Sequence, residues 1–435
     1  MEISHIGNGK AFLIGYTHGL FRYFLRKRGL SCESKTPEVI FYSVYDPLDV
    51  INLRAIRKRN RKTLIIAGGI ECFSPGYLVP YADFACAGEG FGFLRDFPST
   101  SVEDLSTWAE KQKNIVGLGQ IGKILEPDFY IPWSELPAVK VGKNVHYYLV
   151  SRGCRNKCAF CATSWLNPNV QHPAPNMAVL GGMAKQEGIH KKAVYLIGND
   201  TGDFPTPYWS KAAASVSVKK FLANPEQFRK RMLLHIGIEG TTEKQRQLYG
   251  KPISSEEIRT LFHITKNFKI NIVLFFIVQQ PWDMSEFLAA IPYDTDAYPR
   301  VTLKFTQLSP TPWTPMENHD LSREEPFPVK YWFNYLSAKN RRFRTFNVLA
   351  LEKEHTKVLL RRAMPDQTEK ILELRKHWGD FGKWREVVMA DSELGKMYRG
   401  EFKRAFGLKH PHEAWERAKA KVLVAEGGGC LENAT

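Results

Sequence analysis

The sequence lacks long apolar segments, repeats and low-complexity tracts, and it has few cysteines for its length. No apolar run in the 435 residues approaches the roughly 18 residues that a transmembrane helix needs. Residues 1–6 contain no basic region followed by an apolar one, so we expect no export signal. Seven cysteines do not make a disulfide framework in a chain of this size. These absences predict a cytoplasmic protein without a membrane partner.

What the chain does contain is enough apolar material for several cores. Hydrophobic residues make up 43% of the sequence, and the length predicts roughly two or three domains. We predict an α/β protein in which residues 1–100 form a Rossmann-like α/β domain and residues 101–143 form a linker. A barrel over residues 144–320, a mainly helical, basic and aromatic-rich domain over 321–425 and a flexible tail over 426–435 complete the expected layout.

Three of the cysteines, Cys154, Cys158 and Cys161, stand close together after an apolar run at residues 145–150 that we predict to be a strand. Thiolates hold iron–sulfur clusters, which normally have four ligand sites. Three thiols therefore leave one iron open to a ligand that is not protein. A zinc site is the alternative, but no fourth Cys or His lies within the loop. The remaining cysteines are scattered and predict ordinary thiols: Cys32, Cys72, Cys86 and Cys430.

The pattern Cys-x3-Cys-x-aromatic-Cys after the first core strand resembles the radical S-adenosylmethionine (SAM) superfamily. The resemblance implies a [4Fe-4S] cluster on Cys154, Cys158 and Cys161, whose fourth iron chelates the amino and carboxylate groups of SAM. It also implies reductive cleavage of SAM to methionine and a 5′-deoxyadenosyl radical, which abstracts hydrogen from a substrate. An electron donor such as flavodoxin or ferredoxin is an expected partner. Phe160 is expected to pack near the adenine.

The sequence after this loop alternates between predicted strands and helices. With the strand before the cysteines, the expected strands number six and include residues 193–198, 214–221, 233–240, 271–278 and 301–308. The resemblance thus extends over residues ~144–318 and implies a partial (β/α)6 barrel. In such a barrel the chemistry takes place at the carboxyl ends of the strands.

Several strand ends carry residues in the places of the family's SAM-binding motifs. Gly198, Asn199 and Asp200 stand where relatives have a Gly-Gly-Glu-like segment that holds the SAM amino group. Residues 237–257 resemble the "GxE…KPxxxEE" segment of the branch related to cobalamin-binding and methylthiotransferase enzymes. Glu239 is the family's candidate for a SAM contact, and a salt-bridged carboxylate at the strand end is its alternative. Ser254 or Ser255 is expected to cap the following helix.

Two further strand ends are expected to face the same pocket. Gln279 directly follows the strand expected at residues 271–278. Ser309 is the first residue of a segment, residues 309–315, that resembles the branch's "SPxPGTP" turn with Trp313 in place of Gly. The sequence names no catalytic residue that touches the substrate.

The N-terminal domain resembles the end of the Rossmann-like domain that precedes many cobalamin-dependent barrels. Its predicted strands are residues 11–15, 39–44, 63–67 and 82–86, with helices at 20–27 and 50–59. The Asp-x-His-x-x-Gly loop of base-off cobalamin proteins is matched here by His18 alone, because Tyr16 and Phe21 replace its Asp and Gly. Without the Asp, the histidine lacks the acceptor that would fix its tautomer. We therefore favour a degenerate domain, with cobalamin as the less favoured cofactor.

The charge of the chain bears on its partners. Net charge is +16, and residues 329–421 contain 22 Lys and Arg against 12 Asp and Glu, a surplus of 10. Basic residues interleaved with aromatics suit phosphates and stacked bases. The expected nucleic-acid contacts are Arg341, Arg342, Arg344, Arg361 and Arg362. The alternative is a helical cap with a solvated basic face and with its aromatics in the core.

The favoured function is a radical SAM enzyme that modifies or isomerises a base, or a base substituent, in DNA or RNA. Thymidine hypermodification of the kind found in virus DNA is one candidate, and a base must leave its duplex before a radical can reach it. The alternative is a cobalamin-dependent radical SAM methyltransferase that acts on a small molecule or a peptide. A third reading, a non-catalytic nucleic-acid-binding protein, is disfavoured by the intact cysteines.

Overall fold

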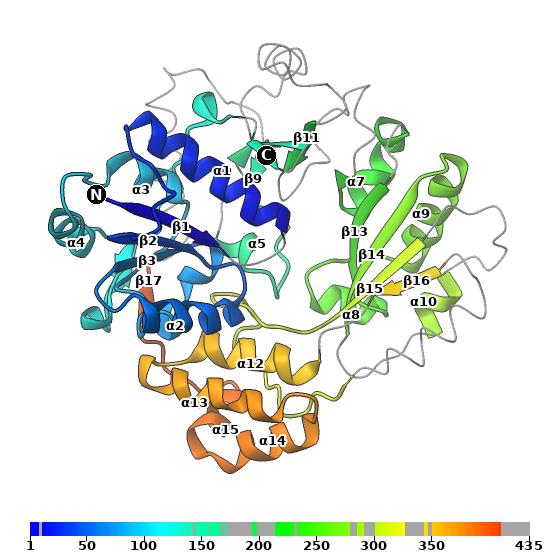
Figure 1. Ribbon diagram of the computed structural model, residues 1–435. Coiled ribbons are helices and arrows are strands. Elements are labelled where there is room, and N and C mark those ends of the chain that lie inside the picture. The colour runs from blue at the N-terminus through cyan, green and yellow to red at the C-terminus, as the bar shows by residue number, and fades with distance from the viewer. Residues whose placement is uncertain are drawn as a thin grey trace.

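A computed structural model describes residues 1–7, 11–137, 139–141, 145–154, 156–166, 170–171, 194–197, 214–229, 233–278, 285–290, 301–326, 343–346 and 350–409. Figure 1 shows an N-terminal sheet, a second group of mainly parallel strands beside it, and C-terminal helices beneath the first sheet. Within the described ranges, no helix is long and apolar enough to cross a membrane.

The N-terminal sheet has five strands in sequence order, and only the last is antiparallel to its neighbour. They are β1 (Ile3–Gly7), β2 (Val39–Ser43), β3 (Leu64–Gly68), β4 (Phe84–Cys86) and β5 (Ile115–Val116). Its helices are α1 (Ala11–Lys27), α2 (Val50–Arg59), α3 (Gly90–Asp96) and α4 (Val102–Lys111). Every residue of β2 is buried, as expected of a parallel strand covered on both faces. The α/β prediction is confirmed here.

The first predicted strand is wrong. Residues 11–15 begin helix α1, and the first strand is β1, which the sequence analysis missed. A short apolar run cannot be told from a buried helix by periodicity alone. Here the apolar positions continue at helical spacing, with Tyr16 and Leu20 buried on one face. His18 therefore lies inside a helix and not in a loop after a strand.

The expected linker over residues 101–143 is also largely structured. Ser101 accepts a hydrogen bond from the Asp104 amide (3.0 Å) and so caps α4, and β5 then pairs with β4. This segment continues the first sheet instead of crossing directly to the barrel. Shorter elements follow: β6 (Ile124–Leu125), which pairs with β17 (Gly407–Leu408), η4 (Leu118–Gln120) and η5 (Trp133–Glu135).

The second group of strands contains all six expected barrel strands. β8 (Val145–Leu149) pairs in parallel with β11 (Val194–Ile197) and in antiparallel with β7 (Val139–Val141). A parallel sheet follows in the order β12 (Ala214–Ser215), β13 (Leu233–Glu239), β14 (Asn271–Val278), β15 (Val301–Gln307) and β16 (Phe343–Phe346). No pairing between β11 and β12 is present among the described residues.

Two boundaries in this part were predicted wrongly. β12 ends after two residues, because Ser217 accepts a hydrogen bond from the Lys220 amide (3.3 Å) and starts helix α7 (Val218–Ala223). β16 adds a strand in a region expected to be mainly helical. The capping prediction at Ser254 is confirmed by a capping box with Glu257 at the start of α9 (Ser255–Asn267). The remaining helices are α5 (Ala162–Leu166), α8 (Glu243–Leu248) and α10 (Ser285–Ala290), with β9 (Ser151–Arg152) paired to β10 (Val170–Gln171).

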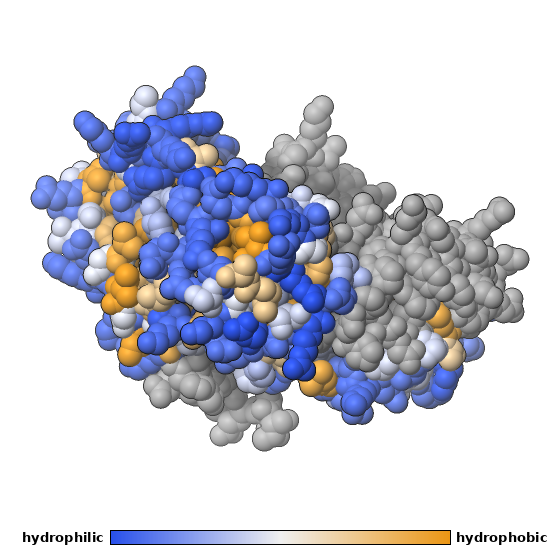
Figure 2. All heavy atoms as spheres, turned by 90° about the horizontal axis from the view of Figure 1, so that it is seen from below, coloured by the Kyte–Doolittle hydropathy of each residue, from blue (hydrophilic) through white to orange (hydrophobic). Residues whose placement is uncertain are grey.

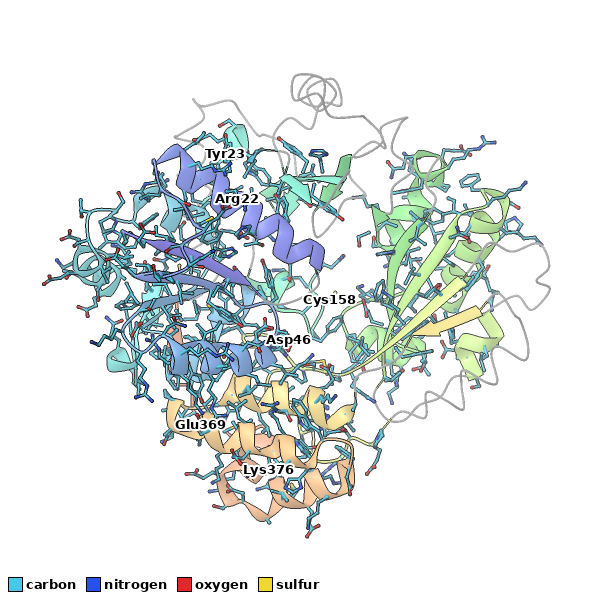
Figure 3. All side chains as sticks on the ribbon, in the orientation of Figure 1. Arg22, Tyr23, Asp46, Cys158, Glu369 and Lys376 are labelled. Carbon is cyan, nitrogen blue, oxygen red and sulfur yellow. The ribbon has the colours of Figure 1, made fainter. Side chains whose placement is uncertain are left out.

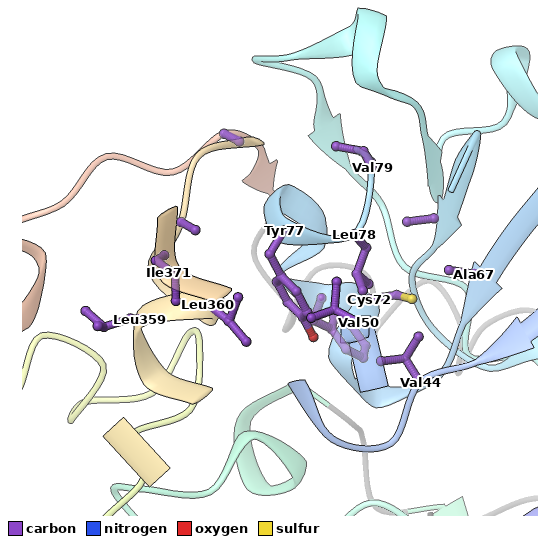
Figure 4. Packing of buried hydrophobic residues seen from close by; sticks show 14 of the residues in the cluster. Val44, Val50, Ala67, Cys72, Tyr77, Leu78, Val79, Leu359, Leu360 and Ile371 are labelled. Carbon is purple, nitrogen blue, oxygen red and sulfur yellow. The ribbon is translucent and has the colours of Figure 1, made fainter. Parts of the chain in front are cut away.

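The C-terminal helices share one hydrophobic core with the first sheet. They are α12 (Leu351–Arg362), α13 (Thr368–Glu373), α14 (Phe381–Ala390) and α15 (Ser392–Tyr398). Figure 4 shows Tyr77 and Leu78 facing Leu360 and Ile371 across this core. Short 3-10 helices adjoin this core: η1 (Pro47–Asp49), η2 (Ile70–Phe73), η3 (Pro75–Tyr77), η8 (Pro365–Gln367) and η9 (Leu374–His377). A further one, η7 (Pro225–Phe228), packs in the core of the second group of strands.

The aromatic residues of these helices pack inside the molecule. Trp384 and Tyr398 are fully buried, and Phe406 is 4% exposed. The face seen from below, where these helices lie, is mostly hydrophilic (Figure 2). These three aromatic residues are therefore part of the core and do not form a surface on which bases could stack, as the alternative interpretation of the basic segment expected.

Candidate functional site

The three cysteines lie on the turn-rich loop between β8 and α5. Cys158 is 4% exposed, whereas Cys154 and Cys161 are partly exposed. The Cys158 carbonyl accepts hydrogen bonds from the Trp165 indole (2.8 Å) and from the Cys161 amide (3.2 Å). In Figure 3 Cys158 lies between the N-terminal sheet and the second group of strands. The loop thus places its thiols where the two parts of the molecule meet.

Loops from two other strand–helix units hold the cysteine loop in place. The Ala159 amide donates to the Tyr249 carbonyl (3.0 Å), and the Met316 amide donates to the Ala159 carbonyl (3.1 Å). The Thr311 hydroxyl donates to the Phe160 carbonyl (2.7 Å). The Phe160 ring meets Tyr249 edge-on, with the ring centroids 5.8 Å apart. The cysteine loop is therefore packed against segments that follow β13 and β15.

An ion pair lies beside the thiols. The Lys251 ammonium is 2.8 Å from a Glu239 carboxylate oxygen, and both side chains are largely buried. Burial raises the pKa of Cys158 to about 11; Lys251 opposes this rise, while Cys161, Glu239 and Cys154 add to it.

Gly250, next to Lys251 in the chain, packs so closely on the cysteine loop that a Cβ on it would lie 2.6 Å from the Lys157 carbonyl, so the ion pair adjoins this loop. Glu239 had two expected roles, a SAM contact and a salt bridge at the strand end. In the structure it forms the salt bridge, with Lys251.

The donor set fits a cluster better than a single ion. Within the described ranges, no three His, Cys, Asp or Glu side chains are arranged to hold one metal ion. A structural zinc site needs four such ligands around one centre. Thiolates of an iron–sulfur cluster each bind a different iron and so surround a larger body. The three thiols on this loop are of the donor type and number that such a cluster uses when its fourth iron is left open.

The remaining predicted site residues divide into two sets. Phe160 and Ser309 both border this region: Phe160 packs on Tyr249, and the Ser309 hydroxyl accepts a hydrogen bond from the Arg361 guanidinium (2.9 Å). The others lie outside the described residues: Gly198, Asn199, Asp200 and Gln279. The common pocket predicted for the strand ends is thus described only in part.

The turn after β15 has a left-handed residue at the position where the motif that it resembles has Gly. Trp313 has φ 62°, a left-handed conformation that glycine adopts without strain and tryptophan rarely does. Its indole donates to the Phe73 carbonyl (2.9 Å), and its ring stacks under the Arg404 guanidinium, 4.2 Å from the ring centroid. The tryptophan therefore ties this turn to the N-terminal sheet, a contact that glycine could not make.

Two predicted nucleic-acid contacts prove to be internal. Arg361 forms two hydrogen bonds to the Glu71 carboxylate, at 2.8 and 3.0 Å, in addition to the one to Ser309. Arg362 is 3% exposed and donates to backbone carbonyls, among them Met397 O at 2.7 Å. Both predictions are wrong, because these guanidiniums are already neutralised or buried by the protein. Arg341 and Arg342 lie outside the described residues, and Arg344 is on β16.

A cavity of about 380 Å³ lies at the carboxyl end of the N-terminal sheet and reaches the cysteine loop. Eight of its 23 lining residues are Phe or Tyr, and Arg152 and Thr163 contribute from either side of the three cysteines. The Arg152 Nε lies 3.3 Å from a Glu89 carboxylate oxygen across this boundary. The Tyr16 hydroxyl lines the cavity, is buried and has no hydrogen-bond partner among the described residues. A cavity of this size and lining suits a small ligand with a polar group opposite Tyr16.

His18 does not line this cavity. Its Nδ1 is 3.1 Å from His5 Nδ1, and its Nε2 is 3.2 Å from the Arg22 guanidinium. Burial followed by Arg22 lowers the pKa of His18, so the ring is held neutral inside this contact network. The match of His18 to a cobalt-binding motif is therefore not supported by its surroundings.

No protein-family model and no curated protein matches the chain. Solved structures do. Among them are structures of OxsB, a cobalamin-dependent S-adenosylmethionine radical enzyme. One contains aqua-cobalamin (12% identity, TM-score 0.49, covering 98% of this chain and 80% of OxsB), and a second also contains S-adenosylmethionine (15%, 0.45, 68% and 52%). This chain therefore spans about half the length of the OxsB chain in the structure with S-adenosylmethionine. The third is TsrM, a radical S-adenosylmethionine methyltransferase from Kitasatospora setae with tryptophan and a SAM analogue (12%, 0.49, 69% and 72%).

The chain is similar to radical SAM enzymes. Those two OxsB structures belong to cobalamin-dependent enzymes, the branch that the sequence motifs resemble. With identities of 12 to 15% and TM-scores below 0.5, the activity of this chain has to be argued from its own residues.

Proposed function

We propose that this protein is a radical SAM enzyme whose [4Fe-4S] cluster is held by Cys154, Cys158 and Cys161. The observation that carries the proposal is the arrangement of the cysteine loop: three thiols and the Lys251–Glu239 pair gather where segments after β13 and β15 hold the loop by backbone hydrogen bonds. When bound, the cluster supplies an electron and an open iron site for SAM.

The chain's own residues have distinct tasks in this proposal. Cys154, the buried Cys158 and Cys161 ligate iron. Phe160 packs against Tyr249 on one side of the loop. Glu239 is the carboxylate that we propose for a SAM contact, and it is paired with Lys251 in this structure. Gly198, Asn199, Asp200, Gln279 and Ser309 stay predictions for the SAM pocket.

For the substrate we keep a base in DNA or RNA as one candidate. Its support is the net charge of +16 and the surplus of 10 basic residues over 329–421. It no longer rests on Arg361 and Arg362, which are occupied inside the protein. Arg341, Arg342 and Arg344 are the remaining expected contacts.

The second candidate, a cobalamin-dependent methyltransferase for a small molecule or peptide, is favoured by the cavity. Three features support a bound ligand at this place: its partly aromatic wall, its extension to Arg152 and Thr163 on either side of the cysteines, and the Tyr16 hydroxyl, which has no hydrogen-bond partner in the described part of the chain. When bound, cobalamin would supply a methyl carrier, and a cavity of about 380 Å³ would hold only part of so large a molecule. His18 would not be its cobalt ligand, because both of its ring nitrogens face other side chains.

One experiment separates the two candidates. The reconstituted protein is incubated anaerobically with SAM and dithionite, together with DNA, tRNA or cobalamin, and the products are measured by mass spectrometry. Faster 5′-deoxyadenosine formation with nucleic acid, and no retained cobalamin, supports base modification. Retained cobalamin, with S-adenosylhomocysteine beside deoxyadenosine, supports the methyltransferase.

A variant set tests the nucleic-acid candidate further. Replacing Arg341, Arg342 and Arg344 by Gln should weaken binding and reduce its salt dependence, because fewer counterions are released. The control replaces the exposed Arg59, Arg61 and Lys62, which removes the same charge at the end of α2. Equal losses in both variants would indicate a general charge effect and contradict a defined contact surface.

A further inference from the structure

We propose that Lys251 is a positioning residue for the cluster: its fixed ammonium group lies beside the cysteine loop and raises the reduction potential of the cluster. The inference rests on the proposed function and names a residue that the SAM-binding motifs do not assign. It starts from the unusual backbone that brings Lys251 and Glu239 together.

Glu239 has φ 68°, a left-handed conformation that is uncommon for glutamate. It follows an irregularity in β13, where the pairing with β14 shifts between Gly237 and Glu239. Such strained positions persist only where the surroundings enforce them, and they gather at functional sites. The shift turns the Glu239 carboxylate back over its own strand, toward Lys251.

Gly237 leaves the space that this ion pair occupies. A Cβ atom on Gly237 would lie 2.1 Å from the Glu239 carboxylate and 2.4 Å from the Lys251 nitrogen. The Lys251 ammonium also lies 3.4 Å from the Gly237 carbonyl. The missing side chain therefore lets the pair lie directly against the end of β13.

The backbone of Lys251 is held equally firmly. Its amide donates to the Arg246 carbonyl (2.8 Å), and its carbonyl accepts from the Ile253 amide (2.8 Å). Arg246 is fully buried and pairs with Glu286 at 2.9 Å. Lysine side chains are usually flexible, so a lysine fixed at both ends in this way has a defined charge position.

This fixed charge adjoins the cysteine loop. Gly250, the preceding residue, has φ 70° and lies so close to the loop that a Cβ would come within 2.6 Å of the Lys157 carbonyl. The Lys251 side chain is only 16% exposed, so solvent screens its charge weakly. The neighbouring Tyr249 carbonyl also accepts a hydrogen bond from the Ala159 amide of the cysteine loop (3.0 Å).

The chemical consequence follows from charge. Reduction adds one negative charge to a cluster, and a nearby cation stabilises the reduced form more than the oxidised one. Glu239 offsets part of this effect while it is paired with Lys251. Removing the ammonium should therefore lower the reduction potential of the cluster. Replacing lysine by arginine keeps a positive charge at this place and should leave the potential close to that of the wild type.

The test is a redox titration, followed by electron paramagnetic resonance, of the reconstituted wild type and of Lys251→Gln, Lys251→Arg and Lys244→Gln. Lys244 is an exposed lysine on α8 and serves as the matched control. For Lys251→Gln we expect the ratio of reduced to oxidised cluster at a fixed potential to fall about tenfold, equivalent to about 59 mV for one electron. Lys251→Arg and Lys244→Gln should stay close to wild type.

If Lys251→Gln forms no cluster but Lys251→Arg does, the positive charge at this position is needed for the cluster to assemble, and this result would also support the inference. An unchanged potential in Lys251→Gln, an equal shift in Lys244→Gln, or loss of the cluster in Lys251→Arg as well would overturn the inference. Failure of the proposed function looks different, since the wild type itself would then form no [4Fe-4S] cluster.

Discussion

Arg361 and Glu71 form a buried ion pair that joins α12 to the end of the N-terminal sheet. Replacing Arg361 by Met should destabilise the protein by about 3–5 kcal/mol, because it leaves the Glu71 carboxylate buried without its partner. Arg54→Met breaks the more exposed pair with Glu369 and should cost at most about 1 kcal/mol. Urea unfolding measures both free energies. Equal losses would contradict the structural role assigned to Arg361.

At this scale the sequence identified the thiols but not their surroundings. Cys154, Cys158 and Cys161 could be recognised because their ligand role depends on spacing along one loop. Arg361 could not, since its partner Glu71 is 290 residues away, and basic composition alone does not separate a buried guanidinium from an exposed one. Lys251 belongs to the "KP" part of the motif. Its ion pair with Glu239 could not be predicted, because that contact depends on the positive φ of Glu239.

At the scale of elements, the cysteine loop depends on the turn after α8. Gly250→Ala should weaken cluster retention, because the new Cβ would come within 2.6 Å of the Lys157 carbonyl and push the loop away. Gly29 offers a matched control: it has nearly the same φ, 71°, but an added Cβ meets nothing within 4 Å. Both alanines should cost about 1 kcal/mol of stability for the left-handed backbone.

Iron and sulfide content after anaerobic reconstitution measures the effect on the loop. Gly250→Ala should retain clearly less cluster than Gly29→Ala. Similar cluster contents in both variants would show that the contact between Gly250 and Lys157 does not position the thiols.

Element boundaries were predicted well where strands are long and buried. β13, β14 and β15 match the expected residues closely, because unbroken β-branched and apolar runs leave little ambiguity. Residues 11–15 were assigned to a strand, since five apolar residues fit either type until Tyr16 and Leu20 reveal the helical face. Ser217 ended β12 early through a capping bond that periodicity does not report.

At the scale of the whole molecule, α12 is buried between the N-terminal sheet and the other C-terminal helices, and it contains His355. His355 Nδ1 is 2.7 Å from the Tyr398 hydroxyl, and its Nε2 has no partner among the described residues. Burial, followed by Arg362, His319 and Arg385, lowers the pKa of His355 from 6.5 to about 3. The folded protein therefore holds this ring neutral.

This pKa has a predictable effect on stability. Between about pH 6.5 and 3 the unfolded chain binds a proton at His355 that the folded protein does not. Stability is therefore fully present above pH 6.5 and falls as the pH falls through this window, by at most about 1.4 kcal/mol per pH unit. His355→Gln should flatten the slope measured by urea unfolding, whereas the exposed His263→Gln should not. Parallel pH profiles for wild type and His355→Gln would contradict the prediction.

The overall architecture was only partly visible in the sequence. Two strand-rich parts could be predicted, because each produces a local pattern. The packing of α12–α15 against the first sheet could not, since it depends on contacts such as Tyr77 with Leu360 that lie far apart in the chain. The cavity beside the cysteine loop likewise depends on how Arg152 and Thr163 meet the N-terminal sheet.

The central claim is that Cys154, Cys158 and Cys161 hold a cluster that cleaves SAM. The most direct measurement is anaerobic: reconstitute the wild type, each single Cys→Ala variant and Cys32→Ala with iron and sulfide, then add SAM and dithionite and quantify 5′-deoxyadenosine. Cys32 is buried in the N-terminal core and serves as the control thiol. We predict about four irons and SAM cleavage in the wild type and in Cys32→Ala, and neither in the other three variants. Deoxyadenosine formed by all three of those variants, or no cluster in the wild type, would contradict the account.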